Sequence, residues 1–579
     1  RGRLWVSSSL EYPFAAAEGS AARDSIRILE DTDSDGLADR VTVFADGLNI
    51  PIGLLPYQDG VICFSIPNIW LLRDTDGDSV CDTREILYGP FDTSRDTHGM
   101  CNAFRMGDDG WVYACHGFNN RSEVAGRDGH RISLTSGSTF RFRPDGSRIE
   151  LYTQGQVNPF GMAIDEFGDI YTADCHTKPV TLLLPGGCYE SFGRPHDGLG
   201  YVPPLMQHLH GSTAIAALAL GSQTSFPEQW QQMTFHGNVM TSRVNSNRLE
   251  RRGSSVKAME EPDFLSCADP WFRPVDVVAG ADGALYIADF YNRIIGHYEV
   301  DLKHPGRDRF RGRIWRVSWE AADVAEQRGP SGYGPVIAGR SAEDLLQVIA
   351  SGPEPAARLA RDQLLTPPVS AETVVSLQRG LRSDSADVRR YCLRMLGRVG
   401  RLETSELQRL AEDAAEQVRV HVFRELRETD QEIPAPLSES LLIAGMADSS
   451  PLVRRAASAA AAERMSAVLV QPLLRLLQTT ELGDVHLRHS VRIALRNHLQ
   501  NDEWLRGLGD TVQTGMDISA VADLSLAAGT EAAAAFVADR LQTLAERQPE
   551  RLPEYLSFAS SRLPLSATDD HANTYVIDD

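Results

Sequence analysis

The stretch Asp108-Asp109-Gly110-Trp111-Val112-Tyr113 decides the fold, because versions of it recur along the first 318 residues. Each version places a glycine, often after an acidic residue, directly before β-branched and aromatic residues, a pattern typical of a hairpin turn and its following strand. The other versions are Gly2–Val6, Gly60–Cys63, Gly168–Tyr171 and Gly283–Tyr286, with a weaker one expected at Met233–Val239. This regular spacing predicts a six-bladed β-propeller over residues 1–318, with a sandwich or stacked sheets as the alternative.

The two ends of this region resemble each other. Arg311–Val317 echoes the composition of Arg1–Val6. A ring of blades protects its edges by joining its ends, so we expect these two segments to share one blade.

The chain changes character after Gly329–Gly339. Glycine becomes rarer, and apolar residues recur with the period of a helix. An apolar residue followed by arginine returns at spacings of 30 to 35 residues, at Val388-Arg389, Val418-Arg419, Val453-Arg454 and Leu487-Arg488. We expect each motif to open the second helix of a pair, with the apolar residue inward and the arginine toward a neighbouring turn. This predicts a HEAT-like α-solenoid at 341–566, between a linker at 319–340 and a polar tail at 567–579.

Composition excludes some partners. The net charge of -22 argues against nucleic acid, whose phosphates require a basic surface, and no apolar run is long enough to span a bilayer. The chain begins without Met and inside a strand pattern, so we expect that its N-terminus has been trimmed and that any targeting segment precedes it. A solenoid surface commonly binds a protein or braces a neighbouring domain.

The eight cysteines contain no CxxC motif, which excludes zinc ribbons and c-type haem attachment. Three pairs lie close in sequence, Cys63/Cys81, Cys101/Cys115 and Cys175/Cys188, and each either bridges a hairpin in an oxidising compartment or stays a pair of thiols. Cys392 lies in a helical pattern and is expected in the core.

Two acidic loops, 43 residues apart, repeat a spacing suited to a hard cation. Three carboxylates of a D-x-D-x-D run and a closing aspartate offer calcium oxygen ligands from one tight turn, although the loops lack the flanking helices of an EF-hand. We expect structural calcium at the blade periphery, and the alternative is an acidic turn that binds nothing. The candidate ligands are Asp31, Asp33, Asp35, Asp39, Asp74, Asp76, Asp78 and Asp82.

Histidines near expected strand ends form the second candidate site. Loops at one end of successive blades converge on the propeller axis, so histidines distant in sequence can meet there. Such a cluster suits a general base, a transition-metal site, or both, whereas a lone histidine is more often structural. The candidates are His98, His116, His176, His210 and His236.

Polar residues near the last predicted blade form a third candidate. Arg273 lies between aromatic residues and a proline, a rigid setting suited to gripping a carboxylate or stacking on a ring. Asp289 and Asn292 follow a predicted strand and are expected to face the axis, and Asn158 and Arg243 flank other strands. The alternative is hydrogen bonding between blades without a ligand.

Several stretches together resemble a known family. They include Asp96-Thr97-His98-Gly99, Ser191–Gly200, His210–Ala214, Asp269–Asp276 and the long segment Ala288–Arg316. Residues 1–318 and the following repeats resemble the exported proteins of planctomycetes and verrucomicrobia described as membrane-bound dehydrogenases. The resemblance implies a periplasmic or secreted protein.

That family's propeller is similar to soluble quinoprotein glucose and sorbosone dehydrogenases, which implies a sugar or glycan substrate and the cofactor pyrroloquinoline quinone. The implied counterpart of their proton-abstracting histidine is His98. The remaining pocket residues would be His116, His176, His210, Arg273 and Asp289, with Asn158, His236, Arg243 and Asn292 near the cofactor. Their Arg-Asn-Pro segment reads Val157-Asn158-Pro159 here, so its arginine is absent.

Three functional hypotheses follow. The first is a carbohydrate-active oxidoreductase of the quinoprotein-like class, whose electrons would pass to a separate cytochrome because no CxxCH is present. The second is a metal-dependent sugar lyase or hydrolase that uses the histidine cluster to hold a Lewis-acidic ion. The third is a non-catalytic exported binding protein whose solenoid docks a partner.

Overall fold

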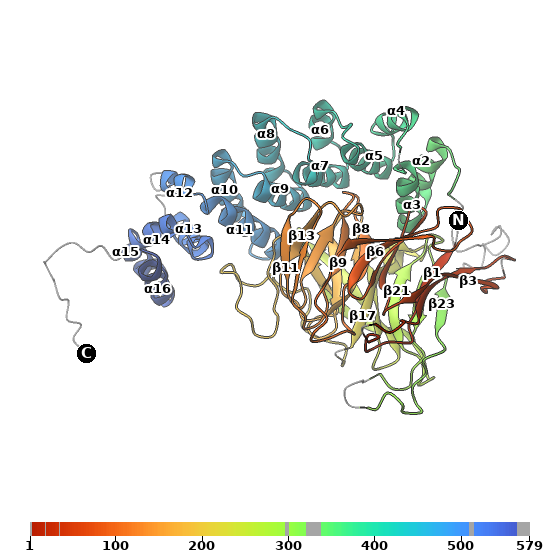
Figure 1. Cartoon of the computed structure of the whole chain (residues 1–579). Helices are drawn as coiled ribbons and strands as arrows, with labels where there is room; N and C mark the ends of the chain where they lie inside the picture. The colour runs from red at the N-terminus through yellow and green to blue at the C-terminus, as the bar shows by residue number, and fades with distance from the viewer. Residues whose placement is uncertain are drawn as a thin grey trace.

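The computed structural model describes residues 3–563 except 18, 34, 213, 296–299, 320–336, 367 and 509–514. Strands occupy the N-terminal half and helices the C-terminal half, and the helices lie in two rows along one side of the sheets (Figure 1). The expected linker 319–340 falls mostly outside the described residues, and the expected tail 567–579 falls wholly outside them. None of the described helices is long and apolar enough to cross a membrane.

The strands form successive antiparallel sheets, each built from strands that are neighbours in sequence, and a two-stranded hairpin is inserted in the third sheet. The first sheet contains β1 (Leu4–Ser8), β2 (Asp24–Glu30) and β3 (Arg40–Leu48), and the second contains β4 (Ile52–Tyr57), β5 (Gly60–Ser65), β6 (Asn68–Arg73) and β7 (Thr83–Tyr88). The third contains β8 (Asn102–Met106), β9 (Val112–Cys115), β12 (Thr139–Phe142) and β13 (Ile149–Thr153), with the hairpin of β10 (Ser122–Ala125) and β11 (Arg131–Leu134), and the fourth contains β14 (Pro159–Ile164), β15 (Ile170–Asp174) and β16 (Thr181–Leu183). The fifth contains β17 (Ile215–Leu220), β18 (Met233–Asn238), β19 (Arg243–Arg252) and β20 (Ser255–Ser266), and the sixth contains β21 (Pro274–Ala279), β22 (Leu285–Asp289) and β23 (Arg313–Val317).

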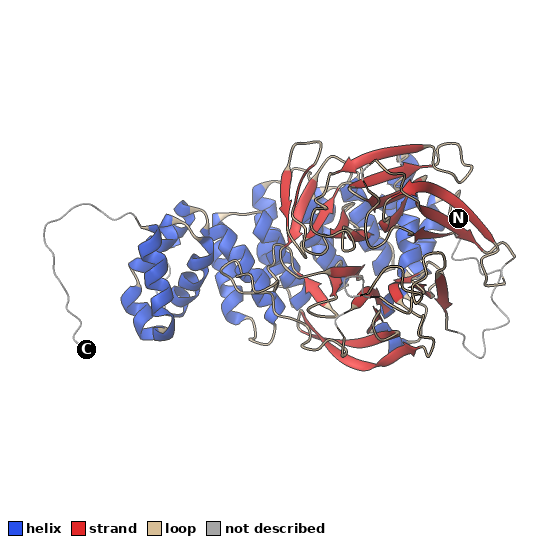
Figure 2. Ribbon diagram, turned by 60° about the horizontal axis from the view of Figure 1, so that its bottom comes forward, coloured by secondary structure: helices blue, strands red, loops and turns tan. Residues whose placement is uncertain are grey.

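The first strand of each sheet packs beside the first strand of the next, through the series β1, β4, β8, β14, β17 and β21. Figure 2 shows the sheets grouped around a common centre. Every strand signal of the repeated motif falls on a strand, including the weak one, which is β18. The acidic-Gly turns form as expected: Gly110 and Gly283 both have φ +78°, a left-handed conformation that glycine adopts without a Cβ clash.

The expected sharing of one blade by the first and last segments is wrong. β1 pairs with β2, from Leu4 opposite Leu29 to Ser8 opposite Ser25, and β23 pairs with β22 in a different sheet. The physical reason is that each terminal strand already has a hydrogen-bonding partner nearby in sequence. Side chains connect the two ends instead: the rings of Tyr12 and Phe290 meet edge to face with centroids 5.4 Å apart.

The helices α2 to α11 form antiparallel pairs, and the second helices of successive pairs stack on one another. A short helix, α1 (Glu228–Gln231), lies among the strands. The others are α2 (Ala342–Ser351), α3 (Glu354–Leu364), α4 (Ala371–Gly380), α5 (Ala386–Arg398), α6 (Thr404–Ala411), α7 (Glu416–Glu428), α8 (Ala435–Met446), α9 (Pro451–Glu463), α10 (Val470–Thr479), α11 (Val485–Leu499), α12 (Asp502–Leu508), α13 (Gly515–Ala528), α14 (Glu531–Ala538), α15 (Leu541–Arg547) and α16 (Leu552–Arg562).

The apolar-Arg motif behaves as expected at the start of α5, α7, α9 and α11. Val418 is fully buried, whereas the guanidinium of Arg419 forms a fork with Asp448, at 2.8 and 2.9 Å, and donates to the carbonyl of Asp413. Arg389 makes the equivalent fork with Asp413 one pair earlier. Each arginine therefore joins its own helix to the turn of a neighbouring pair.

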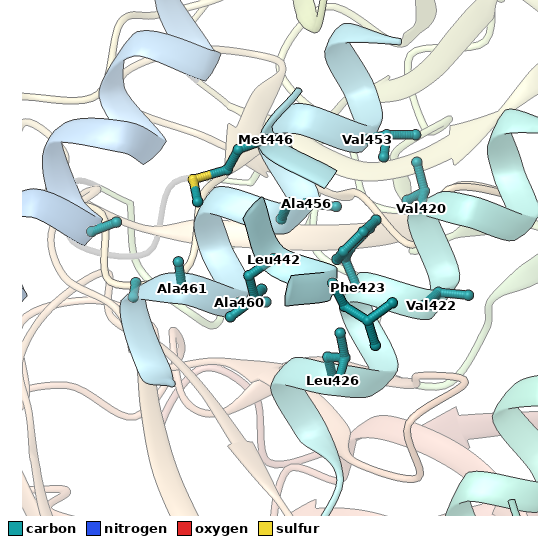
Figure 3. Close-up of a cluster of buried hydrophobic side chains, with 14 of the residues drawn as sticks. Val420, Val422, Phe423, Leu426, Leu442, Met446, Val453, Ala456, Ala460 and Ala461 are labelled. Carbon is teal, nitrogen blue, oxygen red and sulfur yellow. The ribbon is translucent and has the colours of Figure 1, made fainter. Parts of the chain in front are cut away.

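One continuous apolar core runs through the helical half. Figure 3 shows a part of it, where Val420, Phe423 and Leu426 of α7 meet Leu442 and Met446 of α8 and the small side chains of α9. The alanine run 457–462 packs tightly as expected, with Ala457, Ala460 and Ala461 fully buried. All eight cysteines are free thiols, and Cys392 lies in this core.

The second helices of the pairs bind the sheets through buried ion pairs. Asp108, in the β8–β9 turn, contacts Arg361 of α3, and Asp169, in the β14–β15 turn, contacts Arg424 of α7 at 2.6 Å and Arg455 of α9. Burial alone would raise the pKa of Asp108, but the charges of Arg358, Arg361 and Arg390 together hold it well below its usual range. The helical array therefore braces the sheets.

Candidate functional site

A cavity of about 2580 Å³ is lined by the first strands of the sheets and by the loops at both of their ends. One end holds His98, Asn158 and His176. At the other end Leu359 and Leu365, from and just after α3, contribute to the wall. Arg358 ties α3 to this end by donating to the carbonyls of Met106 and Ile164, at the ends of β8 and β14.

His98 and Asp96 form a dyad at the first end of the cavity. The Nδ1 atom of His98 makes a short hydrogen bond with Asp96 Oδ1, while Asp96 Oδ2 accepts from the backbone N–H of Gly99 at 2.8 Å. Asn120 bonds both backbone groups of Asp96, so the carboxylate is held rigidly. A carboxylate on Nδ1 fixes the tautomer whose Nε2 carries the lone pair, which is the arrangement of a general base.

Two amide oxygens beside this dyad have no hydrogen-bond partner within the described part of the chain. They are Oδ1 of Asn102 and Oδ1 of Asn158, both buried atoms of residues that line the cavity. A Cβ added to Gly99 would lie 3.2 Å from Asn158 Oδ1, which places this oxygen next to the backbone beside His98. A buried acceptor without a partner is costly, so either oxygen would gain from a side-chain shift that brought it within reach of a hydrogen-bond donor.

A buried aspartate positions the neighbouring loop. Asp174, at the end of β15, accepts hydrogen bonds from the backbone N–H groups of Val157, Asn158 and His176 at 2.7 to 3.2 Å. His176 is exposed at the cavity wall, with its ring 5.6 Å from that of Phe118. Phe118 also packs 6.0 Å from His98, so it separates the two predicted histidines.

Asp289 and Asn292 line the cavity as expected, but their polar atoms bind other groups of the protein. Asp289 ends β22 as Asp174 ends β15; it accepts from the backbone N–H groups of Arg273 and Tyr291 and pairs with Arg313 at 2.7 Å. Asn292 exchanges hydrogen bonds with the backbone of Asp308.

Arg273 does not reach the cavity wall. Its guanidinium donates to Ser242 Oγ and to the carbonyls of Phe272 and Arg293. Arg243 lies on the surface and pairs with Asp263 at 3.0 Å.

Two of the predicted histidines are structural. His116 uses one ring nitrogen for the carbonyl of Thr135 and the other for Ser122 Oγ, both at 3.0 Å, and burial lowers its pKa to about 4. His236 bonds the carbonyl of Ala217 and Thr234 Oγ1, and burial lowers its pKa to about 3. Neither lines the cavity, because each side chain is enclosed by its own sheet.

His210 lies apart from the cavity. It packs with His208 and Glu260 over the sheet of β19 and β20, and its Nε2 lies 2.8 Å from Asn247 Oδ1. The expected cluster of histidines on the axis is therefore not formed: of the five candidates, His98 and His176 are the two that share the cavity wall.

The acidic loops are hairpin connections, between β2 and β3 and between β6 and β7, and they fold alike. Thr32 donates its N–H and hydroxyl to Asp39, and Thr75 does the same to Asp82. In each loop three carboxylates bring an oxygen within 4.8 Å of one another: Asp31, Asp33 and Asp35 in one, and Asp74, Asp76 and Asp82 in the other. Asp39 and Asp78 lie outside these groups.

Sequence reasoning missed Asp96, Asn102, Asp174 and Asp276. The side chain of Asp276 is exposed in the cavity wall, where desolvation by the surrounding protein raises its pKa and the charge of Arg105 partly opposes this shift. The spacing Asp96-Thr97-His98 carried the signal for the dyad, because the carboxylate lies two positions before the ring it orients.

The fold and the cavity together define a β-sheet protein of propeller type joined to a helical array. The chain belongs to the family defined by a domain of unknown function (DUF7133), whose profile matches residues 1–321. Among curated protein sequences, none matches significantly.

Solved structures similar to the N-terminal half include a protein from Thermus thermophilus assigned as a glucose dehydrogenase-type oxidoreductase, with 17% identity and a TM-score of 0.34, covering 54% of this chain and 100% of that one. Another is the pyranose dehydrogenase PQQ domain from Coprinopsis cinerea, with 12% identity, a TM-score of 0.32 and coverage of 50% and 93%. The chain is also similar, over 41% of its length, to the CpcE–CpcF complex of the phycocyanin lyase from Nostoc, with 19% identity, a TM-score of 0.23 and coverage of 99% of that chain.

Proposed function

We propose that the cavity binds a polyhydroxylated, sugar-like molecule and that His98 removes a proton from one of its hydroxyl groups. The observation that carries the proposal is the Asp96–His98 dyad in the wall of a cavity of about 2580 Å³, beside the side chains of Asn102 and Asn158. The side-chain oxygens of both asparagines are enclosed and have no hydrogen-bond partner among the described residues. A shift of either side chain would turn its oxygen toward a ligand hydroxyl, which is the kind of donor that such an acceptor requires.

The protein's residues divide the proton transfer between them. The Nε2 atom of His98 accepts the hydroxyl proton, and the Asp96 carboxylate on Nδ1 stabilises the imidazolium that forms. Phe118 and Tyr12 pack against the ring of His98 and limit its rotation. This step is common to sugar oxidation and to redox-neutral elimination or isomerisation, so the base alone defines general-base chemistry on a sugar hydroxyl.

Pyrroloquinoline quinone does not fit the residues around His98. The cofactor carries three carboxylates and needs cations. Arginines such as Arg105 and Arg309 line the cavity, but they come from β8 and from the loop after β22, not from the segment of Asn158. Val157 stands where an arginine would be required, and its N–H is bound to Asp174. The guanidinium of Arg273 donates hydrogen bonds to Ser242 and to backbone carbonyls. An oxidoreductase based on this cavity, with a separate cytochrome as partner, would need a different hydride acceptor.

The test is binding and turnover with a panel of monosaccharides, disaccharides and uronic acids. We expect saturable binding to the wild type, the same binding with turnover lost in His98→Gln, and weaker binding in Asn158→Ala. His130→Gln, at an exposed position, is the matched control. Failure of every sugar to bind would refute the proposal, and binding without turnover would favour the binding-protein hypothesis.

A spectroscopic titration with pyrroloquinoline quinone and calcium separates the redox alternatives. We expect no bound quinone that sugar bleaches. Such a signal would contradict our reading of the cavity and favour the exported quinoprotein-type sugar dehydrogenase that the sequence resemblance implies, in a periplasmic or secreted setting.

We also propose that both aspartate loops bind calcium as a structural ion. Their shared hydrogen-bond pattern and their converging oxygens support this, and Asp31 Oδ1 is shielded from solvent without a hydrogen-bond partner among the described residues. For the architecture we propose a six-bladed propeller over 1–318, a linker at 319–340, a HEAT-type solenoid over 341–566 and a polar tail at 567–579. The six meandering sheets and the repeated helix pairs support this division.

A further inference from the structure

His208, His210 and Glu260 form a compact group outside the cavity. One ligand atom from each lies within 4.8 Å of the others. The Nδ1 atom of His210 is 3.3 Å from Glu260 Oε1, and the Nδ1 atom of His208 is 3.5 Å from Glu260 Oε2. Zn²⁺ holds such ligands at about 2.0–2.1 Å, so neighbouring ligand atoms of a tetrahedral site lie roughly 3.3 Å apart. The observed separations match that geometry.

The hydrogen bond on the other side of His210 prepares its ring for a metal. Nε2 lies 2.8 Å from the side-chain oxygen of Asn247, so Nε2 carries the proton and Nδ1 carries the lone pair. A lone pair facing a carboxylate oxygen at 3.3 Å is repulsive unless a cation lies between them.

His208 also has a ring nitrogen that faces Glu260 without a hydrogen bond to satisfy it. Its Nδ1 atom is shielded from solvent, and the described residues supply it with no hydrogen-bond partner. The two imidazole rings meet at 85° with centroids 5.0 Å apart, so both Nδ1 atoms can approach a common point near Glu260. Asp263, on the same strand as Glu260, adds a second negative charge nearby.

We propose that His208, His210 and Glu260 bind a divalent transition-metal ion of the zinc type. Two imidazoles and one carboxylate are a ligand set that zinc prefers, and three protein ligands leave a fourth position open. Glu260 is 55% exposed and His208 is 35% exposed, so this position faces solvent. His210 has φ +51° before Gly211 at +69°, and this turn carries its side chain onto β19 and β20. The ion fastens the loop before β17 to the strand β20, near the residues Ala214 and Ile215 of the cavity wall.

Cobalt is the probe for this site. Co²⁺ bound by nitrogen ligands at low coordination number absorbs visible light strongly, whereas Co²⁺ in an all-oxygen site such as the aspartate loops absorbs weakly. We expect metal-free full-length protein to bind one strongly absorbing Co²⁺ that Zn²⁺ displaces.

Variants locate the ion. We expect both His208→Gln and Glu260→Gln to lower the affinity for Co²⁺ by at least about 100-fold. Glu260→Gln changes an exposed side chain, so we expect this variant to keep the fold intact. His130→Gln is the control and should bind as the wild type does. The proposal is overturned if the strong band is absent from the wild type, or if it persists unchanged in Glu260→Gln.

Discussion

The carboxylate of Asp96 determines the chemistry available to His98. It holds Nδ1 of the ring, and it is itself held by Gly99 and Asn120, so the imidazole has one orientation and one tautomer. Without the carboxylate the ring could take either tautomer, and the imidazolium formed by proton transfer would lose its counter-charge.

At the residue scale, we expect Asp96→Asn to lower kcat on a sugar that the wild type turns over by about 10²-fold or more, which is the size of a general-base contribution. KM should change little, because Asp96 is buried behind His98. His116→Gln is the matched control, since that histidine lies outside the cavity wall; an equal loss in both variants would contradict the assignment.

The histidines show how far residue types alone can be interpreted. The partner of His98 is local in sequence, because Asp96 lies two positions before it, although the carboxylate was not recognised as its partner. His116 and His236 are also each followed by glycine, but their partners Thr135 and Ala217 are 19 residues away in sequence. His210 meets Glu260 only because β20 folds back beside it. Contacts that depend on strand pairing leave no trace in a single sequence.

At the scale of elements, the two hairpin loops are the clearest case of one local sequence adopting one structure twice. The threonine after the first aspartate bonds the last aspartate of the loop in both, so a D-T-D-x-D-x₃-D spacing specifies the turn. The closing aspartate was predicted as a ligand in both loops. In the first loop it holds the turn instead, since Asp39 is outside the converging group.

Calcium removal tests these elements. We expect a chelator to lower the thermal midpoint and calcium to restore it, because an ion bound at 100 times its Kd stabilises the folded state by about 2.7 kcal/mol. Asp33→Asn and Asp76→Asn should each reduce the effect, and Asp46→Asn, at an exposed position between the loops, should not. A midpoint that is indifferent to calcium would contradict the proposed structural ions.

The helical elements were predictable because their signals are local. Each apolar-Arg motif begins a helix, its apolar residue is buried, and its arginine reaches a nearby turn. At Arg389 and Arg419 the arginine also forms a fork with an aspartate of the next pair, which the motif did not predict. What the motif does not encode is the other face of the same helices. Arg390, Arg424 and Arg455 look like solvated charges in sequence, yet they meet buried aspartates from the sheets.

At the scale of the whole molecule, Asp108 and Asp169 join the β-sheet half of the protein to its helical half. Both aspartates belong to hairpin turns beside Gly110 and Gly168, and both lie against several arginines of the helices. The acidic residues of the repeated turn signal therefore have a second role, which a reading of turns alone could not reveal.

We expect Asp108→Asn to destabilise the protein by about 3 kcal/mol, because it removes a buried carboxylate from three arginines, Arg358, Arg361 and Arg390. Asp362 and Glu354 still pair with Arg361 and Arg390, so the loss is smaller than for an arginine left without any counter-charge. Chemical denaturation would measure this loss, and limited proteolysis should release the helical half earlier than in the wild type. Asp145→Asn, in an exposed turn of the same sheet, is the control. Unchanged stability would mean that the interface does not depend on this ion cluster.

The same interface predicts sensitivity to acid. His421 donates to the carbonyl of Glu166 and is buried near Arg390, Arg394 and Asp108; burial first, and then the arginine charges, lower its pKa to about 3. The unfolded chain binds this proton near pH 6.5, so the unfolded state holds more protons between about pH 6.5 and 3, and stability falls as the pH is lowered through this window.

His421→Gln keeps a donor for Glu166 without a titrating group. We expect its thermal midpoint to fall less than that of the wild type between about pH 7 and pH 4.5, with the midpoints at neutral pH within a few degrees of each other. Parallel slopes for the two proteins would contradict a role for His421 in the acid response.

The position of α3 has a consequence for the shape of the cavity. Because Arg358 fastens this helix to the ends of β8 and β14, Leu359 and Leu365 form part of the wall far from His98. The shape of that wall therefore depends on how the helical half is seated on the sheets. A substitution in the helices that shifts α3 would change the cavity without touching any strand.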